Sequence, residues 1–224
     1  MSSFTHDGLL AGTRVATAWI GDLFLRPWSR RGQRQFDRKY GVDAGSGNLD
    51  LPSLANSLYG DARQYAPVPF TQLYKLFKAL PIDPQEYAFI DLGCGKGGAL
   101  VCAAECGFRA VIGIEFDQDL SASATRNLEL FRAGRPTSCT TDIVHSDAVE
   151  YQFPNVPSLI FMFNPFGENT MRAVLRNIEQ SFLEHPRELY IAYFNPVERD
   201  VLESSAHLLS IRHVPSRFVT YKVF

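Results

Sequence analysis

The chain has 224 residues, of which 22 are basic and 24 acidic, giving a formal net charge of −2. This length favours one domain with a sizeable core, and the near-neutral charge gives no general attraction to nucleic acid. No stretch is long and apolar enough to span a bilayer, and we expect no secretory signal, because the N-terminus lacks a basic region followed by an apolar one. The four cysteines lack metal-ligand spacing, so we expect a metal-free protein of the reducing cytoplasm.

The first 80 residues do not alternate between strand and helix, and we expect them to form a cap of helical and extended pieces. Residues 26–39 are basic, which could suit an acidic partner but is more typical of a solvated helix face. No aromatic recognition motif accompanies this segment, so nucleic acid is not an expected partner. The spacing of Phe70, Leu73, Phe77 and Leu80 predicts a helix that Pro81 ends.

From residue 87 onward, apolar strands alternate with amphipathic helices. Strands are expected at 87–92, 110–115, 141–145, 158–163 and 189–194, and helices at 99–106, 120–131, 171–182 and 197–206. Two last strands, 208–214 and 217–224, are joined by a short turn and must be antiparallel. The sequence therefore predicts an α/β fold: a Rossmann-like doubly wound sheet, mostly parallel with a C-terminal antiparallel strand pair, in a core of residues 81–224 preceded by the cap of residues 1–80.

A glycine-rich turn follows the first of these strands. Gly93, Gly95 and Gly98 satisfy a dinucleotide-binding spacing, whereas Gly93, Gly95 and Gly97 satisfy a different spacing that begins with Asp91. A dinucleotide presents a pyrophosphate to the helix N-terminus, and a carboxylate at Asp91 would repel that anion. The acidic residue therefore favours a cationic ligand.

The pattern Asp91-x-Gly93-x-Gly95-x-Gly97 closely resembles the first motif of class I S-adenosylmethionine-dependent methyltransferases. The resemblance implies S-adenosylmethionine as cofactor, S-adenosylhomocysteine as product, and no metal. Glu115 lies 22 residues after Gly93, where an acidic residue is expected to accept both ribose hydroxyls. The expected cofactor-binding residues are Asp91, Gly93, Cys94, Gly95, Gly97, Glu115, Phe116 on the adenine face, Asp147 and Ala148 at the adenine edge, and Asn164.

The segment Asn164-Pro165-Phe166-Gly167 follows the fourth strand. It resembles the Asn/Asp-Pro-Pro-aromatic motif of amino methyltransferases, although the second proline is missing. The resemblance implies that Asn164 and a backbone carbonyl accept hydrogen bonds from a target nitrogen while Phe166 packs over its planar group. A turn in which Asn164 bonds its own backbone is the alternative. We expect the catalytic residues to be Asn164, Pro165, Phe166 and Tyr65, whose direction two nearby prolines would fix.

The tract Phe36-Asp37-x-x-Tyr40-Gly41-Val42-Asp43, together with the later motifs, also resembles a poorly characterised group of bacterial methyltransferases and, more distantly, the Rossmann-type histone-lysine methyltransferases. We therefore expect a methyltransferase acting on nitrogen of a small molecule or a protein side chain, with an oxygen or carbon acceptor as the alternative. A nicotinamide-dependent oxidoreductase and a non-catalytic binding module are the alternatives from other classes. The sequence does not predict the oligomeric state.

Overall fold

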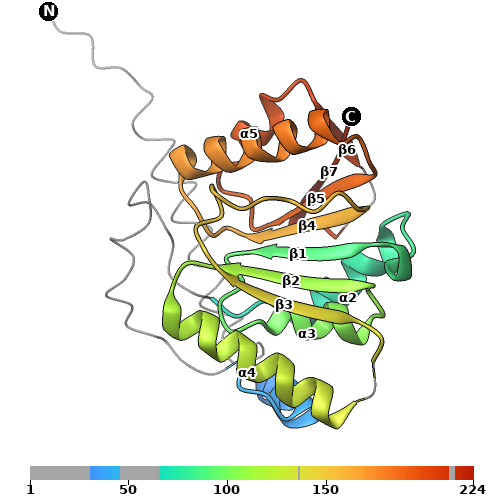
Figure 1. Cartoon of the computed structure of the whole chain (residues 1–224), viewed down its shortest axis with the longest axis vertical. Helices are drawn as coiled ribbons and strands as arrows, with labels where there is room; N and C mark the ends of the chain where they lie inside the picture. The colour runs from blue at the N-terminus through green and yellow to red at the C-terminus, as the bar shows by residue number, and fades with distance from the viewer. Residues whose placement is uncertain (1–30, 46–65, 136, 212–214) are drawn as a thin grey trace, which may run out of the picture.

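The computed structural model of the chain describes residues 31–45, 66–135, 137–211 and 215–224. A seven-stranded sheet in the order β3-β2-β1-β4-β5-β7-β6 forms its centre (Figure 1). The strands are β1 (Ala88–Leu92), β2 (Ala110–Glu115), β3 (Thr140–His145), β4 (Ser158–Phe163), β5 (Leu189–Phe194), β6 (Leu208–Ile211) and β7 (Phe218–Val223). The strand order changes direction between β1 and β4, so the ends of these two strands lie at a topological switch point.

The first five strands are parallel, and the last two are antiparallel to each other, as expected. The sequence did not reveal that β7 inserts between β5 and β6, antiparallel to both. In this position β7 is covered on both sides by neighbouring strands, which suits its mostly buried residues, whereas the short and half-exposed β6 forms the edge.

Helices cover both faces of the sheet (Figure 1). They are α2 (Phe70–Ala79), α3 (Gly98–Glu105), α4 (Gln118–Gly134), α5 (Glu168–Glu184) and α6 (Arg199–Glu203), with a 3-10 turn at Pro84–Glu86 and a helical segment over residues 31–40. The carboxylate of Asp117 starts α4 by accepting the amide hydrogens of Asp119 and Leu120 at 3.0 and 2.9 Å. Helix α6 is shorter than the expected 197–206 at both ends. Residues 197–198 form a turn in which the Glu198 amide donates to the Tyr193 hydroxyl, and the helix ends at Glu203.

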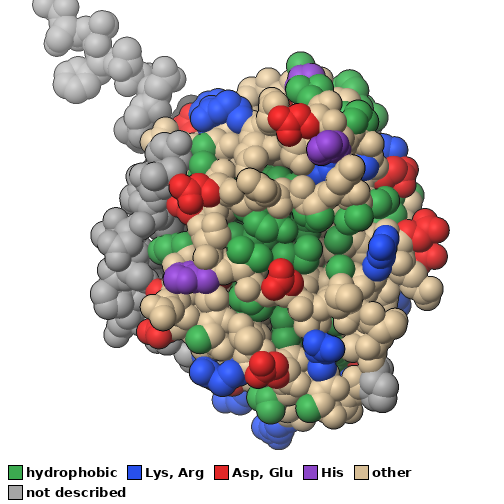
Figure 2. All heavy atoms as spheres, in the orientation of Figure 1, with side chains coloured by type: hydrophobic (Ala, Val, Ile, Leu, Met, Phe, Trp, Pro, Cys, Tyr) green, Lys and Arg blue, Asp and Glu red, His purple; other side chains and the backbone are tan. Residues whose placement is uncertain are grey.

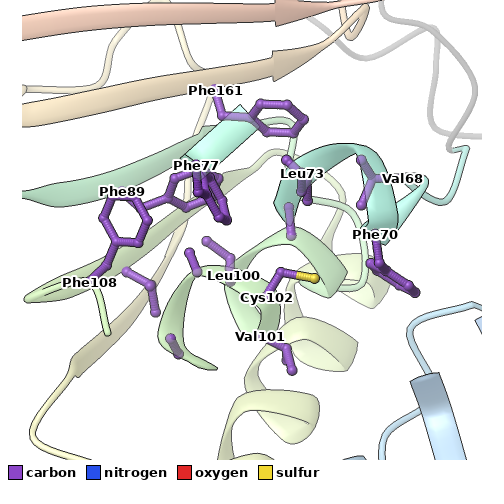
Figure 3. Close-up of a cluster of buried hydrophobic side chains, with 14 of the residues drawn as sticks. Val68, Phe70, Leu73, Phe77, Phe89, Leu100, Val101, Cys102, Phe108 and Phe161 are labelled. Atoms are coloured by element: carbon purple, nitrogen blue, oxygen red, sulfur yellow. The ribbon is translucent and has the colours of Figure 1, made fainter. Parts of the chain in front are cut away.

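One core cluster lies between the sheet and helices α2, α3 and α4 and is rich in aromatic rings (Figure 3). Phe77 of α2 packs edge-on against Phe89 and Phe108, with ring centroids 5.5 and 5.0 Å apart. Cys102 is fully buried in this cluster, as expected of a small core residue. A second cluster fills the opposite face under α5 and α6. Both faces of β1 are therefore buried, which explains its continuous apolar run.

Residues 31–45 pack on the α2–α4 side of the sheet. Phe36 stacks on Phe70 with ring centroids 3.5 Å apart, and the Tyr40 ring lies 5.8 Å from that of Phe131. The described part of the expected cap therefore shares a core cluster with the sheet, while a domain boundary at residue 80 stays a prediction. Among the described residues, no helix combines the length and apolar character needed to cross a bilayer. The cytoplasmic location stays a prediction.

Candidate functional site

The loops that follow β1, β2, β3 and β4 meet at one edge of the sheet, because these four strands are adjacent and parallel. A Cβ atom placed on Gly93 would lie only 2.8 Å from the Cβ of Pro165, so the glycine loop and the Asn164-Pro165 loop are in contact. The His145 ring nitrogen Nε2 lies 2.9 Å from the carbonyl oxygen of Phe116, which joins the β2 and β3 ends. The structure thus brings the motifs of four distant segments together.

The glycine loop uses the spacing that begins with Asp91. Gly93, Gly95 and Gly97 have φ angles of 77°, 54° and 77°, all in the left-handed region. Gly98 instead opens α3, where an added Cβ would lie 3.0 Å from the Phe70 ring. The amides of Gly93 and Cys94 both donate to the carbonyl oxygen of Ile114, at 2.9 and 3.1 Å, which fixes the loop to the end of β2.

Glu115, the last residue of β2, is buried against this loop. Its Oε2 accepts the Gly95 amide hydrogen at 2.8 Å, and its Oε1 accepts that of Asp117 at 3.0 Å. Burial raises the pKa of Glu115, and the backbone hydrogen bonds oppose that rise. Each carboxylate oxygen can accept a second hydrogen bond, so the side chain retains capacity for a vicinal diol.

Asp91 lies on the same face of the sheet as Glu115. Side chains alternate between the two faces along a strand, so Phe89, two residues before Asp91, is on this face as well. Asp91 is only 3% exposed. Its carboxylate makes no hydrogen bond or ion pair with any described residue. Burial raises the pKa of Asp91 well above its usual range, and the negative charge of Glu115 raises it further. A buried carboxylate beside another carboxylate would be stabilised by a positively charged group placed next to it, and the described protein supplies none.

Cys94 faces the protein interior rather than the open edge. A Cβ on Gly113 would lie 2.7 Å from the Cys94 sulfur and 2.7 Å from a Leu100 methyl carbon, so the thiol fills the space over that glycine. Burial raises the pKa of the Cys94 thiol well above its usual range. Only the backbone of Cys94 is therefore in position to meet a ligand at this edge.

The residues expected at the adenine lie on the β2 and β3 ends. Phe116 is half-buried, and Ala148 is buried under the α5 face of the sheet. The Asp147 carboxylate accepts the Val149 amide hydrogen at 3.0 Å, a contact by which an aspartate caps a short turn.

Asn164 has a φ of 44°, an uncommon left-handed conformation that asparagine tolerates better than most residues. Its side-chain oxygen accepts a hydrogen bond of 2.9 Å from the hydroxyl of Tyr193, a fully buried residue of β5. The ring of Phe166, expected to cover a planar acceptor, instead packs in the core cluster of the α5 face and is 7% exposed. Packing among the apolar side chains of this cluster is favourable for the Phe166 ring, because it removes the apolar surface of the ring from water.

A second polar network joins the glycine loop to residues 31–45. The Lys96 ammonium pairs with the Asp43 carboxylate at 3.2 Å, and the Lys96 side chain is only 9% exposed. Asn127 of α4 accepts the Asp43 amide hydrogen at 2.9 Å and donates to the Lys96 and Asp43 carbonyls at 2.9 and 3.2 Å. Tyr65, the remaining expected catalytic residue, lies outside the described residues.

Replacing Asn127 with alanine should loosen residues 31–45 from the glycine loop. The change removes three hydrogen bonds and leaves the Lys96 carbonyl without its side-chain partner, so we expect a loss of about 2–3 kcal/mol in unfolding free energy. Denaturant unfolding measures that loss, and amide exchange should rise over residues 41–45 and 94–97. As a control, Asn155→Ala changes an exposed loop residue and should leave both measurements unchanged. Equal exchange in the two variants would contradict this role.

Sequence reasoning missed Tyr193 and Asn127. Tyr193 lies within an apolar strand, and Asn127 lies on a helix with no motif around it. The one available signal for Asn127 was a polar residue on the apolar face between Ala124 and Leu128, since a buried amide requires partners.

Solved structures of low sequence identity share this fold. A protein from Escherichia coli named as a methyltransferase is 18% identical, with a TM-score of 0.53 over 68% of this chain and 86% of that one. One from Pyrococcus horikoshii, named as an RNA methyltransferase, is 17% identical with a TM-score of 0.53 over 85% and 98%. One from Listeria monocytogenes, named as a predicted N6-adenine-specific DNA methylase, is 16% identical with a TM-score of 0.52 over 73% and 53%.

No protein-family model and no curated protein matches the sequence. The structural neighbours support the expected Rossmann-like fold, and none of those described here bears out the likeness to histone-lysine methyltransferases. They also overturn the expectation that nucleic acid is not a partner. Proteins named for DNA and RNA methylation have this same fold, so a near-neutral net charge does not argue against such a partner.

Proposed function

We propose, from the premise that this chain has the class I methyltransferase fold, that it binds S-adenosylmethionine and transfers the methyl group to an acceptor. The observation that carries the proposal is the buried carboxylate of Asp91, which has no partner among the described residues. A cation placed beside Asp91 would offset the free energy of burying that charge. S-adenosylmethionine carries an ammonium and a sulfonium and has no phosphate.

The same observation disfavours a nicotinamide coenzyme. A pyrophosphate over the glycine loop would lie near the carboxylates of Asp91 and Glu115, both buried. Like charges in a poorly solvated site repel strongly. An oxidoreductase is therefore the weaker alternative, and a non-catalytic module would have no need of a buried acid that lacks a partner among the described residues.

When bound, S-adenosylmethionine supplies an electrophilic methyl carbon on a good leaving group. The protein therefore has to bind, orient and exclude water rather than provide a nucleophile. Glu115 would accept hydrogen bonds from the ribose hydroxyls while its bonds to Gly95 and Asp117 keep the loop in place. Asp91 would hold the positive charge of the amino acid portion.

We favour nitrogen as the acceptor atom. The Asn164 side-chain oxygen is oriented by the Tyr193 hydroxyl and keeps one lone pair, which can accept a hydrogen bond from an amine or amide. Such a bond would direct the nitrogen lone pair toward the methyl carbon. After the transfer, the acceptor nitrogen carries an additional positive charge and releases a proton to solvent water. An oxygen or carbon acceptor is the alternative, and the substrate class extends to nucleic acid, protein and small molecules.

Calorimetry with S-adenosylmethionine, S-adenosylhomocysteine and NAD⁺ tests the proposal directly. We expect both adenosyl compounds to bind at one per chain and NAD⁺ not to bind. Transfer of a labelled methyl group to fractionated RNA, DNA, protein and small-molecule pools then identifies the acceptor class. Binding of NAD⁺ with no uptake of either adenosyl compound would overturn the proposal.

Cofactor affinity should depend on pH through Asp91. The raised pKa of Asp91 in the free protein means that it takes up a proton above the ordinary carboxyl range, and the neutral form no longer attracts a cation. Affinity for S-adenosylhomocysteine should therefore fall as pH decreases through that raised pKa, and binding should release a proton. Calorimetry over a series from about pH 5 to about pH 8, in buffers of different ionisation enthalpy, measures both. A flat profile without proton release would contradict ionised Asp91 as the cation-binding group.

A further inference from the structure

The exposed side of helix 31–40 carries three arginines that the proposed chemistry does not use. Arg31, Arg34 and Arg38, here called the basic ridge, are all exposed. At 3.6 residues per turn they fall within a sector of about 60° and extend for about 10.5 Å along the helix axis. Phe36 and Tyr40 lie on the opposite side and are buried. The ridge is therefore presented to solvent by a helix that is fixed from behind.

The ridge is not neutralised by the described protein. None of its three arginines forms an ion pair or hydrogen bond with another described residue. The exposed Arg172 and Arg199, by contrast, each pair with a glutamate four residues away on the same helix. The whole chain has a net charge of −2, so this local excess of positive charge is not a consequence of overall composition.

Helix 31–40 is linked on one side to the segment that packs on the glycine loop and on the other side to the end of α4. On one side, the Gln33 side chain donates to the Pro67 carbonyl at 3.4 Å, and Phe36 stacks on Phe70, the ring that lies against Gly98 at the start of α3. On the other side, the Arg135 guanidinium donates to the Lys39 carbonyl at 3.3 Å.

Arg135 also lines a surface depression at the end of α4, together with Glu129, Arg132, Ala133 and Thr137. In Figure 2, basic side chains gather at the end of the molecule where α4 and helix 31–40 lie. Arg132 and Arg135 therefore add positive groups at the end of α4, where Arg135 also pairs with Glu105 at 3.7 Å.

We propose that the basic ridge is a docking surface for the sugar-phosphate backbone of a nucleic acid, which it would direct toward the candidate site. The guanidinium fork matches phosphate oxygens, and the length of the ridge allows contact with several phosphates along a strand. An acidic protein fits less well, because protein interfaces have an apolar centre. The ridge face, residues 31, 32, 34, 35, 38 and 39, contains only arginine, lysine, glycine and glutamine.

This inference deepens the proposed function by naming a substrate class, but binding at the ridge can be measured without methyl transfer. Fluorescence anisotropy with labelled single-stranded RNA and duplex DNA should compare the wild type with the triple variant Arg31→Gln, Arg34→Gln, Arg38→Gln. The matched control is Arg172→Gln, Arg176→Gln, Arg199→Gln, which removes the same charge from exposed positions on α5 and α6. Thermal unfolding checks that both variants are folded.

We expect the ridge variant to lower affinity by at least about 30-fold and to reduce the slope of log affinity against log salt by about 2–3, as the loss of three phosphate contacts predicts. The control should stay within about twofold of the wild type. Equal losses in the two variants, no binding by the wild type, or preferential binding of polyglutamate would each overturn the ridge assignment. Calorimetry with S-adenosylhomocysteine is read separately: its failure contradicts the proposed function, and its success in the ridge variant shows that the two sites are independent.

Discussion

Replacement of Asp91 by asparagine is expected to weaken S-adenosylmethionine binding by at least about 100-fold. The substitution keeps the size of the side chain but removes the charge that a buried cation would pair with, and losing one partner of such a pair costs several kcal/mol. The unliganded protein should not be destabilised, since the variant removes a buried carboxylate that has no described partner. Calorimetry measures the affinity, and thermal unfolding measures the stability of the free protein.

The combination of lost binding and retained stability separates a ligand-binding role from a structural one. Asp142→Asn is the matched control, since Asp142 is an exposed carboxylate on β3. This control variant should bind S-adenosylmethionine with the affinity of the wild type. If Asp91→Asn instead bound the cofactor normally, the cation-site assignment would be wrong. If it unfolded, Asp91 would have a structural role that the described contacts do not show.

A methyl group at Gly93 is expected to destabilise the fold by about 2–5 kcal/mol and to impair cofactor binding. At a φ of 77°, a side chain adds strain of about 1–2 kcal/mol. The new Cβ would also lie 2.8 Å from the Cβ of Pro165, a rigid ring that cannot rotate away, which adds an overpacking penalty of about 1–3 kcal/mol. The glycine loop and the Asn164-Pro165 loop would have to move apart. Denaturant unfolding and calorimetry of Gly93→Ala measure both effects.

Gly107→Ala isolates the contribution of the contact with Pro165. Gly107 has a similar φ of 83°, but a Cβ there would have no described atom within 4 Å outside its chain neighbours. This control should show the backbone strain alone and bind the cofactor normally. Equal stability losses in the two variants would show that the close contact with Pro165 does not contribute to the destabilisation caused by Gly93→Ala.

The positions of most strands and helices could be predicted from the sequence, because they depend on local periodicity. Uninterrupted apolar runs such as 158–163 indicated strands buried on both faces, and that is their position in β4. The insertion of β7 between β5 and β6 could not be predicted, since it depends on which strand edges remain free after the other strands have paired. The late start of α6 likewise involves Tyr193, a residue of strand β5 whose hydroxyl accepts the Glu198 amide hydrogen.

The candidate site followed the same division. Asp91 and the glycines with left-handed φ angles could be identified from the sequence. A charged site requires an acidic residue and a left-handed turn favours glycine, and both occur at fixed spacing in the motif. The inward position of Phe166 and the hydroxyl that orients Asn164 were not identifiable, because both depend on neighbours from distant segments.

The sequence by itself determined the βα alternation, the left-handed glycine loop and the acidic residues at the ends of β1 and β2, since each follows from the chemistry of residues close together in the chain. Only the tertiary structure decided that Asp91 is buried without a described partner, that Asn127 joins residues 31–45 to the glycine loop, and that the arginines of helix 31–40 face solvent. Burial and pairing are properties of which segments pack together, and local residue patterns do not contain that information.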